Sequence, residues 1–443
     1  MNNTEYKFDV DLKPNLNYWT NSPIIVQNNI VMSDTNIDTN ICTIKQILSN
    51  DILLKKIENV IQTHPYKLNY KINEQGLDLN KLCDFINTNY SNENVSNNDN
   101  NNDNNIGFKF IYSIDTIKYY IYNSLVISFY SLHTEKYPAK MIGLIIGKKT
   151  ELFIDTVKYD SVEVNFLTLD PKVRNKNLAT LMISILTRET IIKYSIGIAH
   201  YTINNPIKAP CYGLKYYFHR MINIKNLFDT KFISDEISNL NKYKIIYNNF
   251  KNYLPDQQIL YLNKKNISDI SLISNEFINF ICKNINEYSK KNYKIYEYKT
   301  QEQISQLFNS DSFHHFIFIE SNSEQVNFKQ QDLKNLDLKF IKNYICLNEL
   351  ETLCTINNLS YSNGYIYMGF YTNKLDIIIE KISEYIYLFE DSNKIVDVIT
   401  WSDLFNVDES CTIAVKGSGF LKYYLYNIQT IPISNHKNGL VTL

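Results

Sequence analysis

The stretch from residue 141 to residue 202 constrains the fold more than any other part of the chain. Apolar or alternating residues at 141–146, 151–158 and 161–169 predict three neighbouring β-strands. Asp170-Pro171 ends the third strand, because proline has no N–H to donate to a sheet. A mixed structure with a sheet at its centre is therefore expected.

A helix is predicted directly after this break. In residues 178–194, apolar side chains recur at the spacing of one helix face, at 178, 181, 182, 185, 186 and 192. Residues 195–202 return to a strand pattern. The unit reads β-β-β-loop-α-β and predicts the α+β (mixed α/β) class.

The rest of the chain follows a similar order. A helix is predicted at 77–90, followed by strand-like alternation of Phe108, Phe110 and Tyr112. Thr300 and Gln303 have the spacing of a capping box, which predicts a helix up to Phe308. We expect further strands at 243–248, 259–262, 315–319, 340–347, 364–371, 395–400 and 420–428, and further helices at 270–282 and 375–389. Two similar halves, 1–235 and 236–443, fit this order and the length of 443 residues.

Composition narrows the function classes. Lys+Arg is 45 and Asp+Glu is 46, with both signs interspersed, which predicts no large nucleic-acid footprint and leaves a local basic patch as the alternative. Seven scattered cysteines without a C-x-x-C pair predict reduced thiols. The sequence has no His/Cys cluster, so we expect no metal site. The N-terminus has no signal-peptide pattern and no apolar run reaches the ~20 residues of a membrane span, so we expect a soluble, cytoplasmic protein.

Glycine is rare, at 11 residues, whereas tyrosine reaches 35. Asn, Ile, Lys and Tyr all have A/T-rich codons, so part of this composition reflects coding bias and single Asn or Tyr residues are weak indicators. The segment 91–105 is low in complexity and rich in Asn. It is interpreted as a loop insertion, with a flexible lip beside a binding groove as the alternative.

A basic loop between strand and helix is the first chemical signal. It carries Lys172, Arg174 and Lys176 just before the helix that starts at Leu178. Free N–H groups and partial positive charge at a helix start favour phosphate, so the loop predicts a pyrophosphate cradle and resembles the acyl-CoA loop of GNAT-type acyltransferases. A basic loop that is merely solvated remains the alternative.

The strand before this loop suggests a mechanism. If its hydrogen bonding breaks at Phe166–Leu167, two backbone N–H groups can stabilise the oxyanion formed when a thioester is attacked. The sequence contains no G-x-S-x-G and no Cys/His signature of a covalent nucleophile. Attack on a thioester held in this way would need no catalytic Ser or Cys.

At these residues the chain resembles the glycylpeptide N-tetradecanoyltransferases, or N-myristoyltransferases. Glu163-Val164-Asn165-Phe166-Leu167 matches the family signature E-[VI]-N-F-L. The other matching segments are Tyr18-Trp19, Arg174–Ala179, Tyr201-Thr202, Tyr217-Phe218-His219-Arg220, Tyr423-Tyr424-Leu425-Tyr426-Asn427 and Gly439-Leu440-Val441 with Leu443. Their order covers roughly residues 15–443.

The resemblance implies a fold and a set of roles. It implies two pseudo-symmetric GNAT-like halves that form a saddle-shaped sheet with flanking helices, the first for myristoyl-CoA and the second for the peptide groove. The implied catalytic residues are Asn165, Phe166, Leu167, Thr202 and the carboxylate of Leu443 as base. The implied myristoyl-CoA contacts are Tyr18, Trp19, Phe166, Leu167, Thr168, Leu169, Arg174, Asn175, Lys176, Asn177, Leu178 and Ala179. The implied peptide contacts are Tyr90, Phe108, Phe110, Tyr112, Tyr217, His219 and Tyr365.

The resemblance also implies partners. These are proteins or peptides with an N-terminal glycine, with membrane association only through lipidated products, and a monomeric enzyme that needs no metal. Taken singly, each aromatic is more often a core or surface residue, and His219 is more often a structural histidine. Two alternatives stay open: a GNAT-like acyltransferase for another chain length or a lysine amine, and a non-catalytic binder of acyl chains or peptides.

The chain departs from the family pattern at several positions. Thr168, Leu169, Asp170 and Pro171 replace C-x-H-K, and Asn177 stands where a basic residue is frequent, which is expected to weaken phosphate binding. The signature K-F-G-x-G-D-G survives only as Gly417-Ser418-Gly419, and the acidic stretch after Tyr90 is reduced. Less negative charge predicts a weaker preference for lysine downstream in the peptide.

Overall fold

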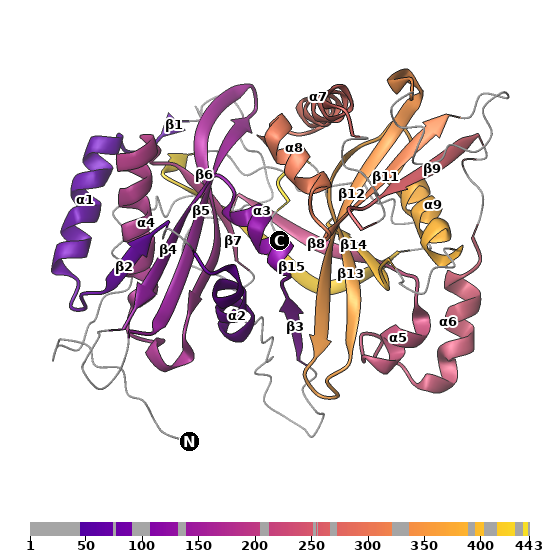
Figure 1. Cartoon of the computed structure of the whole chain (residues 1–443), viewed down its shortest axis with the longest axis horizontal. Helices are drawn as coiled ribbons and strands as arrows, with labels where there is room; N and C mark the ends of the chain where they lie inside the picture. Colours follow the sequence, from indigo (N-terminus) through magenta and orange to yellow (C-terminus); the bar gives the residue numbers. More distant parts are fainter. Residues whose placement is uncertain are drawn as a thin grey trace, which may run out of the picture. The chain divides into compact units, whose positions relative to one another are not determined.

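The computed structural model describes residues 45–73, 77–90, 107–131, 139–203, 212–250, 254, 256–265, 273–320, 336–388, 395–402, 414–429 and 437–441. The predicted sites at Tyr18, Trp19 and Leu443 and the Asn-rich segment 91–105 lie outside these residues. The structure is mixed, with sheets flanked by helices, so the predicted fold class is confirmed (Figure 1). The chain divides into two compact units.

The first unit contains residues 1–90, 120–214 and 421–434. Its strands are antiparallel to their neighbours except for the parallel pair β6 and β7. In sheet order they are β2 (Asn69–Ile72), β4 (Ser124–Tyr130), β5 (Met141–Ile154), β6 (Val157–Leu169), β7 (Ala199–Ile203) and the C-terminal part of β15 (Val415–Tyr426). A separate short ladder joins β1 (Lys45–Gln46) to β16 (Ile428–Gln429).

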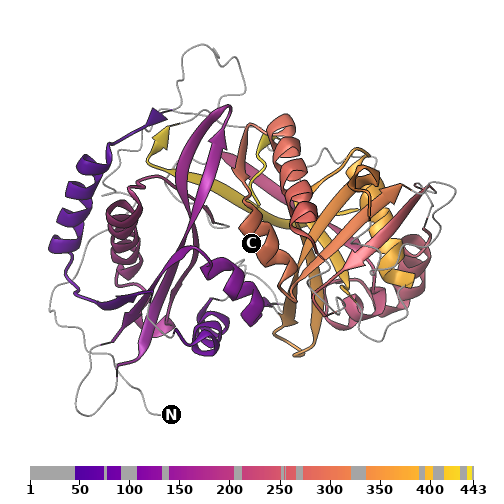
Figure 2. The same ribbon diagram turned by 45° about the horizontal axis from the view of Figure 1, so that its top comes forward.

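Two helices of this unit, α1 (Asn50–Thr63) and α4 (Leu178–Tyr194), lie side by side (Figures 1 and 2), whereas α2 (Leu79–Asn89) packs near β6. The bounds of α4 match the predicted 178–194, and Leu178, Leu181, Met182, Ile185 and Leu186 enter the core with β4 and β5. The prediction for Ile192 is wrong, because its side chain is 61% exposed. The last turn of α4 instead buries Ile191 against Leu53 and Ile57 of α1.

The three strands predicted at 141–169 are two long ones. β5 and β6 form one hairpin, whose turn follows Ile154 and has Asp155 at φ 53°. The polar residues between the predicted strands continue β5, since Lys148 pairs with Glu163 and Thr150 with Ser161. Cross-strand partners thus outweigh the local break in apolar pattern.

The second unit contains residues 91–119, 215–420 and 435–443. Its strands are β8 (Gly213–Met221, from residue 215), β14 (Val398–Ser402), β13 (Ser360–Phe370), β12 (Ile341–Cys354), β11 (Phe313–Glu320) and β9 (Gln257–Leu262) in sheet order, with β3 (Phe108–Ile111) on β12. β13 and β14 are parallel, and the other pairs with a known register are antiparallel. β10 (Ile295–Tyr298) lies between two helices in the chain.

The helices of the second unit are α3 (Ile114–Ile121, to residue 119), α5 (Ile224–Asp229), α6 (Leu240–Tyr247), α7 (Asn275–Asn292), α8 (Gln301–Phe308) and α9 (Leu375–Leu388). The capping box of Thr300 and Gln303 is confirmed. The helix predicted at 270–282 begins at Asn275, where Ser274 caps it by accepting the Phe277 N–H, and continues to Asn292. The strand predicted at 243–248 is wrong.

Residues 243–247 belong to α6 instead. The apolar and polar residues there do not alternate strictly, and Tyr243 and Tyr247 are four residues apart, which places them on one helix face. Their rings stack at 6.1 Å, and Tyr247 is buried. The helix therefore forms where its aromatic face packs onto the unit.

The two units do not follow the single boundary predicted near residue 235. The main division falls between Leu214 and Lys215, and residues 91–119 and 421–434 each belong to the unit of a distant part of the chain. Across the described ranges, no helix is both long and apolar enough to cross a membrane. The four cysteines described, at 83, 282, 346 and 354, are buried and not in disulfides.

A buried ion pair gives a test of the second unit. Arg220 Nε lies 3.0 Å from Glu380 Oε2, with side chains only 1% and 3% exposed, and Nη2 donates to the Tyr247 carbonyl. Arg220→Met leaves the Glu380 carboxylate buried without its cation, so we expect a loss of about 3–5 kcal/mol in urea unfolding. Lys158→Met in the exposed pair with Glu151 is the control and should change stability by less than about 1 kcal/mol. Equal effects of the two substitutions would contradict the account.

Candidate active site

Strand β6 is interrupted at Phe166 and Leu167. Opposite it, Leu144 of β5 pairs with Thr168 and Ile146 pairs with Asn165, so residues 166 and 167 stand in a β-bulge. Phe166 has φ 50°, in the left-handed region that a non-glycine residue rarely adopts. The strand irregularity expected at this position is therefore present.

Aromatic packing holds this bulge. The Phe166 side chain is 3% exposed, and its ring contacts Tyr90 and Tyr120 edge to face, at centroid distances of 5.5 Å and 5.3 Å. The hydroxyl of Thr168 donates to the Phe166 carbonyl at 3.1 Å. A left-handed residue costs about 1–2 kcal/mol, whereas burial of a phenylalanine side chain contributes about 1.5–3 kcal/mol, so the packing can sustain the distortion.

Asn165 and Thr202 belong to adjacent strands. β6 and β7 run parallel, with Glu163 opposite His200, and Asn165 and Thr202 each lie two residues further along. Because side chains alternate along a strand, Asn165 lies on the same face as Glu163, and Thr202 lies on the same face as His200. The amide nitrogen Nδ2 of Asn165 is buried and has no hydrogen-bond partner among the described residues. A buried donor of this kind is available to a ligand carbonyl or carboxylate.

Buried polar residues continue along this face. Lys148, Glu163 and His200 are 1–2% exposed and share cross-strand registers in β5, β6 and β7. The Ser161 hydroxyl lies 3.1 Å from His200 Nδ1. The sequence analysis did not select Lys148 or His200. Their position as polar residues within strands that are otherwise apolar could have indicated them.

The basic loop turns tightly from β6 into α4. Asp170 caps a short 3-10 helix (Pro171–Val173) by accepting the Lys172 N–H at 3.0 Å. Arg174 donates from Nη2 to the Asn89 carbonyl at 2.7 Å and from Nε to the Leu169 carbonyl at 3.2 Å. Arg174 thus ties the loop to the end of α2, a role that the sequence did not indicate.

Two asparagines make the turn possible. Asn175 and Asn177 have φ 64° and 54°, a conformation that glycine adopts most easily and asparagine tolerates better than other residues. The loop therefore needs no glycine. Leu178 is buried, whereas Lys176 and Ala179 are partly exposed at the start of α4.

A cluster of aromatic rings stands in the second unit, centred on Tyr365 of β13. Phe110 of β3 and Tyr217 of β8 each contact its ring at 6.1 Å. Next to it, Phe108 and Phe232 pack on Tyr361, and His219 packs on Phe232 at 5.3 Å. Five of the seven predicted peptide residues meet in this cluster, which we call the aromatic cluster, and the sequence analysis missed Tyr361 and Phe232.

The other two predicted peptide residues lie elsewhere. Tyr90 belongs to the first unit, where it packs on Phe166, and burial raises the pKa of its hydroxyl. Tyr112 follows β3 and is buried at 2% exposure. Alternation in a sequence does not reveal that β3 ends at Ile111, one residue before Tyr112.

His219 is held neutral inside the aromatic cluster. Its Nδ1 lies 2.9 Å from the Thr400 hydroxyl, and burial lowers its pKa to about 4. Gly417 approaches it closely, since a Cβ on Gly417 would stand 2.5 Å from His219 Nε2. This contact explains a glycine in a chain that has few.

The segment from Lys437 to Val441 is anchored within the second unit. Asn438 pairs with Ile295 of β10, and the Gly439 N–H donates to the Ile295 carbonyl at 2.7 Å. Leu440 is 2% exposed. The burial expected for the C-terminal residues is thus seen up to Leu440, and Val441 is partly buried.

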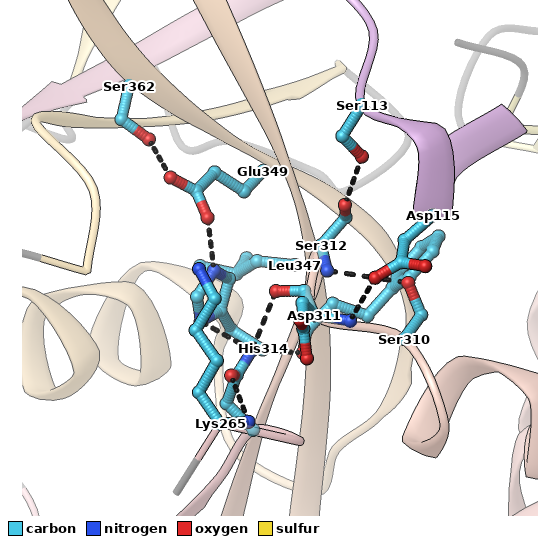
Figure 3. A network of polar contacts seen from close by, with 12 residues as sticks. Ser113, Asp115, Lys265, Ser310, Asp311, Ser312, His314, Leu347, Glu349 and Ser362 are labelled. Carbon is cyan, nitrogen blue, oxygen red and sulfur yellow. Dashed lines mark hydrogen bonds and ion pairs between the residues drawn. The ribbon is translucent and has the colours of Figure 1, made fainter. Parts of the chain in front are cut away.

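A second polar network spans β11, β12 and β13: His314 lies 2.9 Å from Glu349, to which the Ser362 hydroxyl donates (Figure 3). His314 also lies 2.7 Å from the Tyr261 hydroxyl of β9. Burial raises the pKa of Glu349, but hydrogen bonds from His314 and Ser362 outweigh it and hold that pKa below its usual range. Glu349 faces away from Tyr365, whose partner in the ladder is Asn348, so this network fixes strand register and adds nothing to the aromatic cluster.

Comparison with known proteins shows which family this chain resembles. Residues 52–211 match the family model of myristoyl-CoA:protein N-myristoyltransferase, N-terminal domain. The chain is 25% identical over 306 residues to the glycylpeptide N-tetradecanoyltransferase of Plasmodium falciparum, covering 69% of this chain and 67% of that protein. The chain is thus similar to the N-myristoyltransferases, as its motifs suggested. These similarities indicate an acyltransferase.

Further matches agree with the N-myristoyltransferase assignment. The enzyme of Candida albicans is 25% identical over 292 residues, which cover 62% of this chain and 57% of that protein. A crystal structure of Saccharomyces cerevisiae N-myristoyltransferase with bound myristoyl-CoA superposes with a TM-score of 0.64 at 16% identity, covering 92% of this chain and 97% of the other. That likeness establishes a shared fold. In the described part of the chain, no group of His, Cys, Asp and Glu could hold a metal ion.

The neutral histidine predicts a pH dependence of stability. His219 has a pKa near 4 when folded and about 6.5 when unfolded, so the unfolded state binds the extra proton as the pH falls through this window. The contribution is constant above pH 6.5 and is lost between pH 6.5 and 4. Between pH 7 and pH 5, the free energy of unfolding of the wild type should fall by about 2 kcal/mol more than that of His219→Gln. Urea unfolding of both proteins at the two pH values measures this difference. The same loss in both proteins would refute a buried neutral His219.

Proposed function

We propose that this protein transfers a myristoyl group from myristoyl-CoA to the N-terminal glycine amine of proteins or peptides. The observation that carries the proposal is the bulge at Phe166 and Leu167, next to the buried amide of Asn165. Similarity to the N-myristoyltransferases supports the same donor and acceptor, which the names of the matched enzymes state.

In this proposal the first unit binds the donor. The N–H groups of Phe166 and Leu167 stabilise the negative charge that develops on the thioester oxygen. Arg174, Lys176 and the free N–H groups at the start of α4 interact with the phosphates of CoA. Asn165 and Thr202 orient the glycine. No covalent intermediate on the protein is needed.

Two proton transfers balance the reaction. The carboxylate of Leu443 takes a proton from the glycine ammonium, because only the free amine is a nucleophile. The amine nitrogen then bonds to the acyl carbon, the carbon–sulfur bond breaks, and CoA leaves as its thiol after taking up the second amine proton. The anchored segment before Leu443 supports this role.

The aromatic cluster is proposed to contact the first residues of the peptide. The rings of its members present wide apolar faces and polar edges, which suit an extended peptide. The neutral imidazole of His219 can form a hydrogen bond with the peptide without bringing a positive charge to it. We also propose a cytoplasmic, monomeric enzyme that meets membranes through its lipidated products.

The direct test incubates the protein with myristoyl-CoA and a peptide that begins with glycine, followed by mass spectrometry. A mass gain on the free peptide and none on its N-acetylated copy supports the proposal. A gain only on lysine, or preference for another chain length in competition among acyl-CoAs, favours the first alternative. Binding of acyl-CoA without any transfer favours the non-catalytic binder.

Removal of Thr442 and Leu443 tests the proposed base. Turnover should fall by about 10²–10⁴-fold, because general-base catalysis contributes that much, while acyl-CoA affinity measured by calorimetry stays unchanged. A matched variant adds one glycine after Leu443, which keeps every residue but moves the C-terminal carboxylate by one position. Its turnover should also fall. Full turnover in the truncated protein excludes this base.

Arg174→Met tests the phosphate loop. We expect the KM for myristoyl-CoA to rise about tenfold with little change in the KM for peptide, because a charged hydrogen bond contributes about 1.5–3 kcal/mol. Arg174 also donates to the Asn89 carbonyl, so its loss can disturb the loop as well as remove a charge. Lys172→Met is therefore measured as well, because it removes a positive charge from the loop and leaves that hydrogen bond in place. An unchanged KM in both variants would show that the loop does not bind phosphate.

A further inference from the structure

Asn348 of β12 is a buried side chain that the proposed mechanism leaves unused. Its exposure is 0%, and neither Oδ1 nor Nδ2 of its amide has a hydrogen-bond partner among the described residues. Burial of a polar group without a partner destabilises a fold, so natural proteins keep such groups where water or a ligand satisfies them. An amide whose donor and acceptor are both open can pair with two groups of one ligand.

The neighbours of Asn348 explain why its amide stays open. In the sheet it stands between Phe313 of β11 and Tyr365 of β13, whose side chains share its face. A phenylalanine ring has no hydrogen-bonding atom, and the Tyr365 ring packs edge to face against Phe110 and Tyr217. Strand pairing therefore holds a polar side chain beside the centre of the aromatic cluster.

Asn363 of β13 repeats this arrangement close by. Its cross-strand neighbours are Leu350 of β12 and Val398 of β14, both apolar, and its buried Oδ1 has no partner in the part of the chain that the structure describes. Alternation along β12 and β13 puts Asn363 on the same face as Asn348 and Tyr365. Two open amides therefore adjoin one aromatic ring.

The ring of Tyr365 is accessible, and its neighbours are neutral. Tyr365 is only partly buried, as are the two rings that pack on it, so a ligand meets these rings before it reaches Asn348. Rotation of side chains is common where a partner binds. Thr400 of β14 stands beside Tyr365, and burial lowers the pKa of its hydrogen-bond partner His219 to about 4. A neutral polar group suits this site better than a charge, which would be buried among neutral groups.

We propose that Asn348 and Asn363 select the peptide by hydrogen-bonding an uncharged amide side chain near its N-terminal glycine. This inference rests on the proposed function and adds a specificity to it. The carbonyl oxygen of the peptide's amide accepts from Nδ2 of Asn348, and the amide nitrogen donates to Oδ1 of Asn348 or Asn363. An apolar side chain of similar size leaves these atoms unpaired, so the site discriminates against it.

Asn348→Leu is the test variant, because leucine has as many side-chain heavy atoms as asparagine and none of them is polar. The probes are peptides that begin with glycine and carry asparagine or leucine at each of the next five positions in turn. With the wild type, kcat/KM should be about 10–100-fold higher for asparagine at one or more positions. The variant should lose this preference while its KM for myristoyl-CoA stays unchanged. Its urea midpoint should rise, because an unpaired buried amide is removed.

Asn343→Leu is the matched control. Asn343 lies on the same strand and is also fully buried, but its Nδ2 donates to Gln257 and Asn373, and its Oδ1 accepts the Thr372 N–H. Loss of these bonds should lower the urea midpoint. The preference for asparagine in the peptide should stay as in the wild type, measured where the control is folded.

Three results would overturn the proposal. These are no preference for asparagine at any position in the wild type, a preference that Asn348→Leu retains, and a fall of the urea midpoint in Asn348→Leu as large as in Asn343→Leu. If the wild type transfers no acyl group, the proposed function fails, and calorimetric binding of the same peptides in the presence of myristoyl-CoA decides the site. A preference for asparagine that Asn348→Leu removes then supports the site, and any other result overturns it.

Discussion

The left-handed backbone at Phe166 is the constraint on which the first unit depends. A β-bulge at this point interrupts a hairpin that is otherwise regular over 14 residues of β5 and 13 of β6. The cost of the φ value is offset by an aromatic ring packed between Tyr90 and Tyr120. If the ring is lost, the strand can relax to regular pairing and the donors proposed for the oxyanion are no longer turned toward a ligand.

The second unit is organised around buried cations with different partners. Arg220 pairs with Glu380 and Lys299 with Glu297, whereas Lys215 binds a backbone carbonyl of the C-terminal segment. The two ion pairs compensate charge with charge and need no further role.

Much of the first site was predictable because its signals are local. The bounds of α4 and the strand irregularity at Phe166 follow from periodicity or from a short motif, as the capping box at Thr300 does in the second unit. The order of family motifs led to the same family that the comparisons match. Local signals could not show that Arg174 binds the Asn89 carbonyl, since that contact depends on where α2 ends.

Non-local contacts account for the rest. The polar residues of β5 look like a break until Glu163 stands opposite Lys148. In the segment 243–247, which is helical, Tyr247 is held from outside the segment, since Arg220 Nη2 donates to its carbonyl. Tyr361 and Phe232 reach the aromatic cluster only after β13 and the loop after α5 are in place. Pairing across such separations is absent from any window of the sequence.

The bulge at residues 166–167 is the central claim, and a crystal structure with a non-hydrolysable ketone analogue of myristoyl-CoA tests it most directly. The measured quantity is the distance from the ketone oxygen to the backbone nitrogens of Phe166 and Leu167. The account predicts 2.7–3.1 Å to both, the range of working oxyanion donors. A bound analogue whose oxygen lies beyond hydrogen-bond distance of both nitrogens would contradict it.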